Sequence, residues 1–216
     1  MNITKIVVIT GASRGLGLVT ANAFASEGWK VVGTGTSPRP SELPEAVEYH
    51  QFDASNAVDC QAFWAIVKAS APKASITLIN NAGGYISGKF QELEPEVYQK
   101  QMNANFFAAV YMTHALTKIV ESARIINIIS TAAHVSASHS AAYGASKAAE
   151  KYFFQTLQKE LKSSAFKITN IYPDAIATHG GDSRAMSPED LAYFVRSAAE
   201  FKGTYYIRDI TLATSM

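Results

Sequence analysis

Tyr143 and Lys147, four residues apart, and Ser130, thirteen residues before the tyrosine, are the side chains of this sequence best suited to chemistry. Residues four apart on a helix lie one turn apart on the same face, so the phenol and the ammonium can share one site. A cation beside a phenol favours the phenolate, which suits a tyrosine that exchanges a proton with an alcohol or ketone oxygen. The spacing alone also occurs by chance on solvated helix faces, so its meaning depends on the elements that position it.

Strand-like and helix-like segments alternate along the chain. Apolar runs predict strands at residues 5–10, 31–33, 47–52, 75–79, 124–129, 167–172 and 205–212. Helices are predicted from Leu16 to near Gly28, at 56–69 with Phe63, Ile66 and Val67 buried, at 94–120 as one or two helices, at 142–161 and from Pro188. This alternation indicates right-handed βαβ crossovers, and therefore an α/β fold with a doubly wound, mostly parallel seven-stranded sheet and helices on both faces. No repeat or linker is evident, so residues 1–216 are expected to form a single domain.

The first βα turn reads Thr10-Gly-Ala-Ser-Arg-Gly-Leu-Gly17. It follows a predicted buried strand and opens a helix, which is the context that a dinucleotide-binding turn requires. Gly11 permits the tight turn, while Gly15 and Gly17 allow close approach of a pyrophosphate and packing of helix on strand. The N–H groups at the helix N-terminus would then meet the phosphates. A glycine-rich turn that binds nothing is the less favoured alternative.

The residues after the second strand favour NADP(H) as the cofactor, with NAD(H) as the alternative. NAD-specific sites usually hold the ribose 2′-hydroxyl with an acidic residue, whereas a nearby arginine accommodates a 2′-phosphate. Residues 29–40 contain no acidic residue. Thr36, Ser37 and Arg39 in this region, and Arg14 in the glycine turn, offer hydroxyl and guanidinium groups that suit a phosphate dianion. For Arg39 an ordinary surface role is an equal alternative.

With these motifs in order, the chain resembles the short-chain dehydrogenase/reductase family from residue 5 to about residue 212. Four motifs carry the resemblance: Thr10–Gly17, Asn80-Asn-Ala-Gly83 after the fourth strand, Ser130 after the fifth, and Tyr143-x3-Lys147. The resemblance implies a Rossmann-type NAD(P)-binding domain and an oxidoreductase that transfers a hydride between nicotinamide and a carbonyl or alcohol substrate. A ketone or aldehyde reductase is the expected type. The alternative is a regulator that binds NADP(H) without turnover.

The resemblance also implies a role for each site residue. Tyr143 would be the acid in reduction and the base in oxidation, Lys147 would hold the nicotinamide ribose, and Ser130 would polarise the substrate carbonyl. Asn105 falls where the family keeps a helix-breaking asparagine and would hold a water that links Lys147 to solvent. Asp53 matches the residue used against adenine. The expected cofactor contacts are Gly11, Ser13, Arg14, Gly15, Leu16, Gly17, Thr36, Ser37, Arg39, Asp53, Ala54, Asn81, Ala82, Gly83, Tyr143, Lys147, Pro173, Ile176 and Thr178.

The substrate pocket is less defined by the sequence. Its expected residues are Ser130, Tyr85, His134 and Asp174. Asp174 stands where the family has glycine after Pro173, which adds a side chain near the nicotinamide. Only residues 179–186 separate Thr178 from the next predicted helix start, so we expect a shallow, open pocket.

Charge and composition narrow the class of protein. The 19 Lys and Arg residues against 18 Asp and Glu residues favour neither nucleic acid nor a membrane surface as partner. No apolar run approaches the ~18 residues of a membrane span, and no basic-then-apolar leader opens the chain, so we expect a cytoplasmic protein. The lone Cys60 excludes an internal disulfide. No metal is expected, because no compact ligand motif is formed by the loop histidines His134, His139 and His179.

The run Tyr152-Phe153-Phe154 exceeds what one buried helix face needs. Family members pair through this helix and the one that contains Asn105, so the resemblance implies a homodimer or homotetramer. The alternative is packing of these aromatic rings within the monomer.

Overall fold

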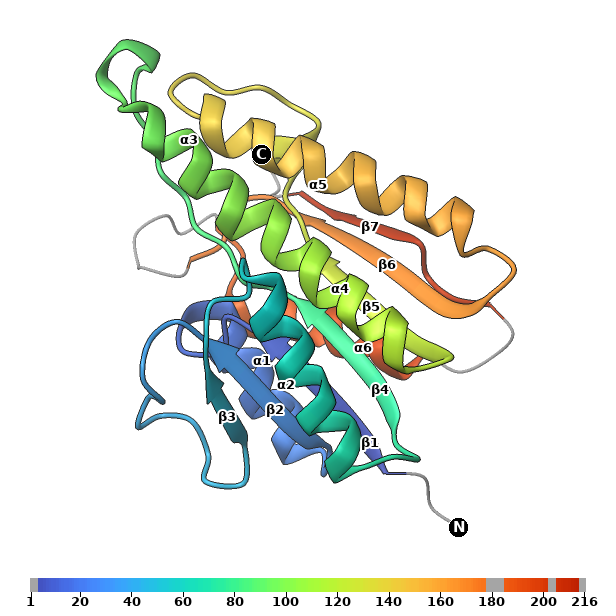
Figure 1. Ribbon diagram of the computed structural model, residues 1–216. Coiled ribbons are helices and arrows are strands. Elements are labelled where there is room, and N and C mark those ends of the chain that lie inside the picture. Colours follow the sequence, from blue (N-terminus) through green and yellow to red (C-terminus); the bar gives the residue numbers. More distant parts are fainter. Residues whose placement is uncertain (1–3, 178–184, 202–204, 214–216) are drawn as a thin grey trace.

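A parallel β-sheet lies between two layers of helices in the computed structural model, which describes residues 4–177, 185–201 and 205–213 (Figure 1). The strands of the described residues are β1 (Lys5–Thr10), β2 (Lys30–Gly35), β3 (Glu48–Gln51), β4 (Ser75–Asn80), β5 (Ser122–Ile128), β6 (Ala165–Pro173) and β7 (Asp209–Leu212). Their order is β3-β2-β1-β4-β5-β6-β7, and all six neighbouring pairs are parallel. The predicted α/β, doubly wound sheet of seven strands is confirmed.

Helices cover both faces of the sheet, as predicted. They are α1 (Gly15–Ser26), α2 (Ala57–Ser70), α3 (Pro95–Met102), α4 (Ala108–Ile119), α5 (Ala141–Glu160) and α6 (Pro188–Glu200), with the shorter η1 (Phe90–Glu92), η2 (Asn103–Phe107) and η3 (Thr131–Ala133). α2, α4 and α5 lie in front of the sheet in Figure 1, and α1 and α6 lie behind it. In the described part of the chain, no helix has the length and hydropathy that crossing a bilayer requires.

The strands are apolar on both sides because both sides are covered. Along β1, Ile6 and Val8 pack toward α2 and α4, whereas Val7 and Ile9 pack toward α1 and α6, and all four side chains are fully buried. Successive strand residues point to opposite faces, so a continuous apolar run is what a central parallel strand needs. The sequence order reverses at β1 and β4, and ligands of such sheets bind beyond the carboxyl ends of the strands at that point.

A buried row of polar side chains sets the register of the strands that carry the site. Asn80, Asn127, Asn170 and Asp209 are register partners on β4, β5, β6 and β7. Their side chains bond in series at 2.8, 2.8 and 3.1 Å, and Asn80 also donates to Thr113 of α4 at 3.0 Å. Because a buried amide without a partner is costly, slippage of one strand would break the series.

One predicted core residue is wrong. Ile66, expected to be buried, is 51% exposed, because the buried face of α2 consists of Cys60, Phe63, Trp64 and Val67. Ile66 lies two positions after Trp64, which turns it about 200° around the helix and away from the sheet.

Residues 94–120, predicted as one or two helices, form two, α3 and α4, joined by the π-helical turn η2. One strand bound differs from the prediction. The last strand begins at Asp209 rather than at residue 205. Upstream of β7, the Ile207 carbonyl accepts its hydrogen bond from the Thr169 side chain, so the regular ladder with β6 does not extend further.

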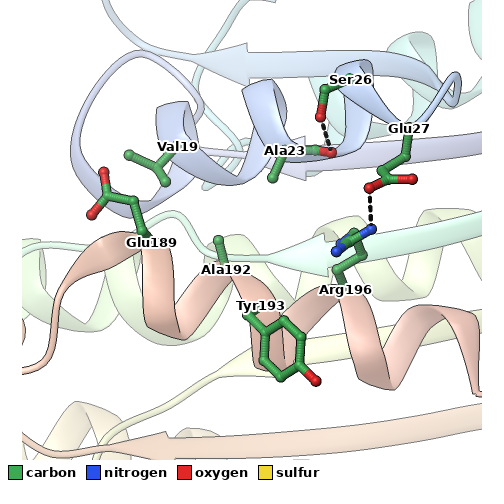
Figure 2. Close-up of a pocket in the computed structure, with 8 residues that line it drawn as sticks. All are labelled: Val19, Ala23, Ser26, Glu27, Glu189, Ala192, Tyr193 and Arg196. Carbon is green, nitrogen blue, oxygen red and sulfur yellow. Dashed lines mark hydrogen bonds and ion pairs between the residues drawn. The ribbon is translucent and has the colours of Figure 1, made fainter.

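A groove between α1 and α6 opens on the surface of the rear layer (Figure 2). Its lining residues are Val19, Ala23, Ser26, Glu27, Glu189, Ala192, Tyr193 and Arg196. The Arg196 guanidinium lies 2.5 Å from the Glu27 carboxylate across the gap between the two helices. None of the predicted site residues lines this groove, so it is separate from the predicted site.

Candidate active site

The turn between β1 and α1 has a backbone that only glycine adopts readily. Gly11 and Gly15 have φ angles of +67° and +53°, in the left-handed region. A Cβ atom at Gly17 would lie 2.1 Å from the Gly11 carbonyl oxygen, so α1 can rest on this turn only without a side chain there. No side chain caps the N-terminus of α1, which leaves its first N–H groups available to a phosphate. The turn therefore fits a dinucleotide.

The loop after β4 is bonded directly to that turn. Thr10 Oγ1 accepts hydrogen bonds from the N–H groups of Asn81 and Ala82, both at 2.9 Å. The Asn81 amide donates in turn to the carbonyl oxygens of Thr10 and Gly11, at 2.8 and 3.2 Å. These bonds hold the loop after β4 against the glycine turn at the carboxyl ends of β1 and β4. Gly83 lies in the same loop, and a Cβ atom there would lie 2.7 Å from Asn105 Oδ1, so the backbone can approach Asn105 only without a side chain.

The end of β2 reaches the same turn. A Cβ atom at Gly35 would lie 3.4 Å from Ser13 Oγ and 2.5 Å from the Tyr49 hydroxyl. Tyr49, on β3, donates a hydrogen bond to the Ser37 carbonyl oxygen at 2.8 Å. Tyr49 therefore fills the space in which a side chain at Gly35 would begin, a role that was not predicted from the sequence.

The two arginines near this end of the sheet differ in their contacts. Arg39 donates to the carbonyl oxygens of Val47, Leu43 and Pro44 at 2.6, 3.0 and 2.6 Å, so its guanidinium holds its own loop together. Arg14 is exposed, and its guanidinium makes no hydrogen bond or ion pair with another described residue. Arg14 is therefore the better placed of the two to meet a phosphate.

The other expected cofactor residues lie along the same edge. Asp53 follows β3, is exposed and accepts a hydrogen bond from the Ser55 N–H at 2.8 Å. Leu16 and Ala54 are buried. Pro173 ends β6, and Ile176 beyond it forms an isolated bridge with Met186. Thr178, like most of the loop 179–186, lies outside the described residues.

Asn105 lies in the π-helical turn η2, where the chain passes from α3 to α4. Turns of this kind are frequent at functional sites. Its buried amide accepts from the Gly84 N–H at 2.8 Å and donates to the Gly84 carbonyl at 3.1 Å and to Ser146 Oγ at 2.9 Å. Ser146 Oγ donates onward to the Tyr143 carbonyl oxygen at 2.7 Å. Asn105 thus joins the loop after β4 to the helix that carries Tyr143 and Lys147.

Ser130 follows β5 and begins η3. Its Oγ accepts a hydrogen bond from the Ala132 N–H at 3.1 Å. A hydroxyl group has one hydrogen and two acceptor sites, so this contact orients Ser130 and leaves its hydrogen to be donated. A carbonyl oxygen of a substrate is a suitable acceptor.

Tyr143 lies in the first turn of α5 beside Tyr85. The two rings meet edge to face with centroids 5.0 Å apart, and the Tyr85 hydroxyl lies 3.1 Å from Ser140 Oγ. The Tyr143 hydroxyl makes no hydrogen bond within residues 4–177, 185–201 and 205–213. It can therefore bond to a substrate oxygen.

Lys147 is buried and held by two acceptors. Its Nζ donates to the Ile128 carbonyl oxygen at the end of β5, at 3.0 Å, and lies 2.8 Å from Glu150 Oε2. Burial raises the pKa of the Glu150 carboxyl to about 7, and the Lys147 ammonium opposes that rise. Glu150 was not predicted from the sequence, although its spacing of three residues from Lys147 puts both on one face of α5.

A family comparison agrees with this arrangement. The profile described as short chain dehydrogenase matches residues 5–187. The chain belongs to the short-chain dehydrogenase/reductase family. Its membership and the oxidoreductase activity that the sequence predicted are thereby confirmed, since relatives carry oxidoreductase names.

Three relatives of this short-chain dehydrogenase/reductase illustrate the likeness. A 3-ketodihydrosphingosine reductase of Bacteroides thetaiotaomicron is 32% identical over 186 residues, which cover 85% of this chain and 68% of the relative. The crystal structure of a family member from Vibrio parahaemolyticus has a TM-score of 0.84 at 29% identity and covers 97% of this chain and 96% of its own. The closed form of a serine dehydrogenase complexed with NADP+ has a TM-score of 0.87 at 25% identity, with coverage of 96% and 94%.

Two of the expected pocket residues of this short-chain dehydrogenase/reductase are held by other contacts. The His134 ring packs against Tyr172 with centroids 4.6 Å apart, and its Nδ1 lies 2.9 Å from Lys151 Nζ. Burial and the Lys151 charge lower the pKa of His134. Asp174 Oδ1 accepts a hydrogen bond at 3.2 Å from Oγ1 of Thr131, the residue that follows Ser130 in the chain. Tyr85 thus contacts the Tyr143 ring and Asp174 contacts the residue after Ser130, whereas His134 contacts Tyr172 and Lys151.

Cys60 is a free, buried thiol of the core. Burial raises the pKa of the Cys60 thiol to about 12, which keeps it in the unreactive neutral form. Within the ranges that the structure describes, no three His, Cys, Asp or Glu side chains come together as metal ligands.

Proposed function

We propose that this oxidoreductase uses NADP(H) to interconvert a small ketone or aldehyde with its alcohol, through Ser130, Tyr143 and Lys147. The observation that carries the proposal is the hydrogen bond from Lys147 Nζ to the Ile128 carbonyl oxygen at 3.0 Å. It fastens α5 to the end of β5, two residues before Ser130. Two hydroxyl groups with a hydrogen to donate, those of Ser130 and Tyr143, are thereby supplied by adjacent elements at the carboxyl edge of the sheet.

The proposed reduction gives each side chain a separate task. Bound nicotinamide supplies the hydride to the carbonyl carbon. Ser130 donates a hydrogen bond to the carbonyl oxygen and holds it in place, and Tyr143 transfers its proton to the same oxygen as charge develops there. The Lys147 ammonium stabilises the phenolate that remains and contacts the nicotinamide ribose. In the oxidation, Tyr143 removes the proton from the alcohol.

The substrate would lie between Tyr143 and the groups around it. Tyr85 supplies an aromatic wall, edge on to Tyr143, and is 61% exposed. Thr131 follows Ser130 in the chain and donates a hydrogen bond to Asp174, so both lie close to Ser130. An aromatic wall and an open edge favour small or cyclic carbonyl compounds.

The proposal is tested by the oxidation of NADPH in the presence of a panel of ketones and aldehydes. We expect absorbance at the nicotinamide wavelength to fall only when a carbonyl compound is present, with formation of the matching alcohol. Binding of NADPH without consumption across the panel would instead support a regulator that binds the cofactor without turnover.

NADP(H) is the proposed cofactor because the 2′-phosphate end of the site lacks an acidic side chain. Gly35 ends β2 without a side chain, and Tyr49 fills the space beyond it. Exposed Arg14 directly precedes α1. The serine dehydrogenase that this structure resembles is complexed with NADP+, which supports the same choice.

We expect Arg14→Ala to raise the dissociation constant for NADPH about 10- to 100-fold and to change that for NADH little. A hydrogen bond to a charged group contributes roughly 1.5–3 kcal/mol, and only NADPH carries the ribose 2′-phosphate. Arg39→Ala is the matched control, because its guanidinium bonds to loop carbonyls and its loss should affect both cofactors alike. Equal weakening of both cofactors by Arg14→Ala would argue against a phosphate contact.

A homodimer or homotetramer is also proposed, through α4 and α5. Phe106 packs edge on to Phe153 with centroids 5.7 Å apart, Phe154 is buried in the core, and Tyr152 is 77% exposed. Aromatic rings beyond the needs of the core favour a second copy as partner. Sedimentation equilibrium should give two or four times the chain mass of 23.3 kDa, whereas a single chain mass would refute the pairing.

A further inference from the structure

Glu150 is a buried charged side chain that the proposed reaction does not use. It lies on α5, is 1% exposed, and its Oε2 is 2.8 Å from Lys147 Nζ. Burial of a carboxylate carries a desolvation cost that an ion pair often fails to recover in full. Because this desolvation cost is borne directly beside Lys147, we infer that the Glu150 carboxylate has a role in the proposed site.

The contacts of Lys147 indicate what that role is. An ammonium group has three N–H donors and no acceptor. One donor is directed to Glu150 Oε2 at 2.8 Å and one to the Ile128 carbonyl oxygen at 3.0 Å. Two acceptors on different elements fix the position of Nζ, and one donor is left for a ribose hydroxyl or a water.

We propose that Glu150 is a positioning residue of this site: its carboxylate fixes Lys147 Nζ at the end of β5 and offsets part of the ammonium charge that acts on Tyr143. The inference rests on the proposed function, in which Lys147 contacts the nicotinamide ribose and Tyr143 exchanges a proton with the substrate.

Other charges do not compete for Glu150 among the described residues. Lys147 is the one charged group that acts on its carboxyl. The elements packed against α5 include α3, η2, η3, β6 and the end of β5, and neither η2 nor η3 contains a titratable residue. His134, directly after η3, contacts Lys151 of α5. The titratable side chains on the other elements are Glu96, Tyr98 and Lys100 on α3, Arg124 on β5, and Lys167 and Tyr172 on β6.

The Glu150 carboxyl changes its charge in the working range of an enzyme. Burial raises its pKa to about 7, so it gains a proton as the pH falls through neutrality and is ionised above it. Only the ionised form offsets the Lys147 charge. Glutamine has the shape of the protonated acid, so Glu150→Gln mimics the low-pH form at every pH.

We expect Glu150→Gln to move the alkaline limb of the pH profile for NADPH-dependent reduction to lower pH by about one unit or more. A neighbouring opposite charge typically shifts a pKa by that much, and the Glu150 carboxylate lies 2.8 Å from Lys147 Nζ. Two effects act in the same direction. The unpaired ammonium favours the phenolate more strongly, and the buried ammonium also loses its own proton more readily. Wild type and variant should differ above pH 7 and converge below about pH 6. The matched control is Glu160→Gln, an exposed residue of the same helix, whose profile should equal that of the wild type.

A second measurement needs no turnover, and so separates this inference from the proposed function. NMR of protein labelled with ¹³C-lysine follows the Lys147 side chain, assigned by its loss in Lys147→Met. We expect this signal to titrate at lower pH in Glu150→Gln than in the wild type, whether or not any carbonyl is reduced. If carbonyl compounds are inert but this titration shifts, the proposed reaction fails and the coupling of Glu150 to Lys147 holds.

Glu150→Asp keeps the carboxylate but shortens it by one methylene, and provides a second variant should Glu150→Gln fold poorly. Its pH profile and lysine titration should lie between those of the wild type and Glu150→Gln. Profiles and titrations of Glu150→Gln or Glu150→Asp that coincide with those of the wild type and of Glu160→Gln would overturn the proposal, because a merely structural carboxylate would move neither.

Discussion

Tyr143→Phe should lower kcat for carbonyl reduction by about 10²- to 10⁴-fold, the range that a positioned acid or base contributes. The substitution removes one oxygen atom and retains the ring that packs edge on to Tyr85. The Tyr143 hydroxyl bonds to no other described residue, so its removal should leave the free energy of unfolding almost unchanged. The dissociation constant for NADPH should also stay within about threefold, because the glycine turn and Lys147 remain; that range corresponds to a loss of less than about 0.7 kcal/mol.

Tyr152→Phe is the matched control for this experiment. Tyr152 lies on the same helix, is 77% exposed, and carries the same hydroxyl group away from the site. Rates are measured with saturating NADPH and the best substrate of the carbonyl panel, and cofactor binding is followed by fluorescence. A Tyr143→Phe protein that binds NADPH and reduces the substrate at the rate of Tyr152→Phe would exclude Tyr143 as the proton donor.

The fold was predictable because its signals are local and repeated. Each central strand is a short apolar run, since both faces of a parallel sheet are covered, and Ile6 to Ile9 show this directly. The glycine turn was predictable for a related reason, because positive φ at Gly11 and Gly15 is a backbone demand that few residues meet. Helix boundaries and the buried side of α2 were less predictable, as Ile66 shows, because neighbouring helices decide which of several apolar residues is covered.

The placement of the proposed reacting groups was predictable from local spacing, and their partners were less so. Tyr143 and Lys147 are related by one helical turn, whereas Tyr49 acts on the end of β2 from another strand. The contacts of Arg39 were also not predictable, because the three loop carbonyls that accept from its guanidinium come close to it only in the folded chain. Glu150 did have a local signal, a charged residue on the face of α5 shared with Lys147. Its burial depends on the elements that cover that face, which the sequence does not place.

Gly17→Ala should lower the free energy of unfolding by about 3 kcal/mol and weaken NADPH binding at least tenfold, the first from overpacking and the second from a displaced turn. The new Cβ atom would lie 2.1 Å from the Gly11 carbonyl oxygen and 2.6 Å from Asn81 Nδ2. The first of these atoms is backbone, so the clash is relieved only if α1 moves away from the turn that it contacts. That movement would also carry the N-terminus of α1 away from the phosphates.

Two other glycines separate this clash from the general effect of adding a methyl group. Gly144 lies in α5 with its nearest new contact at 3.6 Å, so Gly144→Ala should stabilise the protein by up to about 1 kcal/mol, the usual gain of alanine in a helix. Gly28 has φ of +75° and open space around it, so Gly28→Ala should cost about 1 kcal/mol from backbone strain alone. Urea unfolding of the three variants should therefore rank Gly17→Ala as the least stable. If Gly17→Ala instead matched Gly28→Ala in stability and kept full affinity for NADPH, the close contact of α1 with the glycine turn would not be what positions the cofactor.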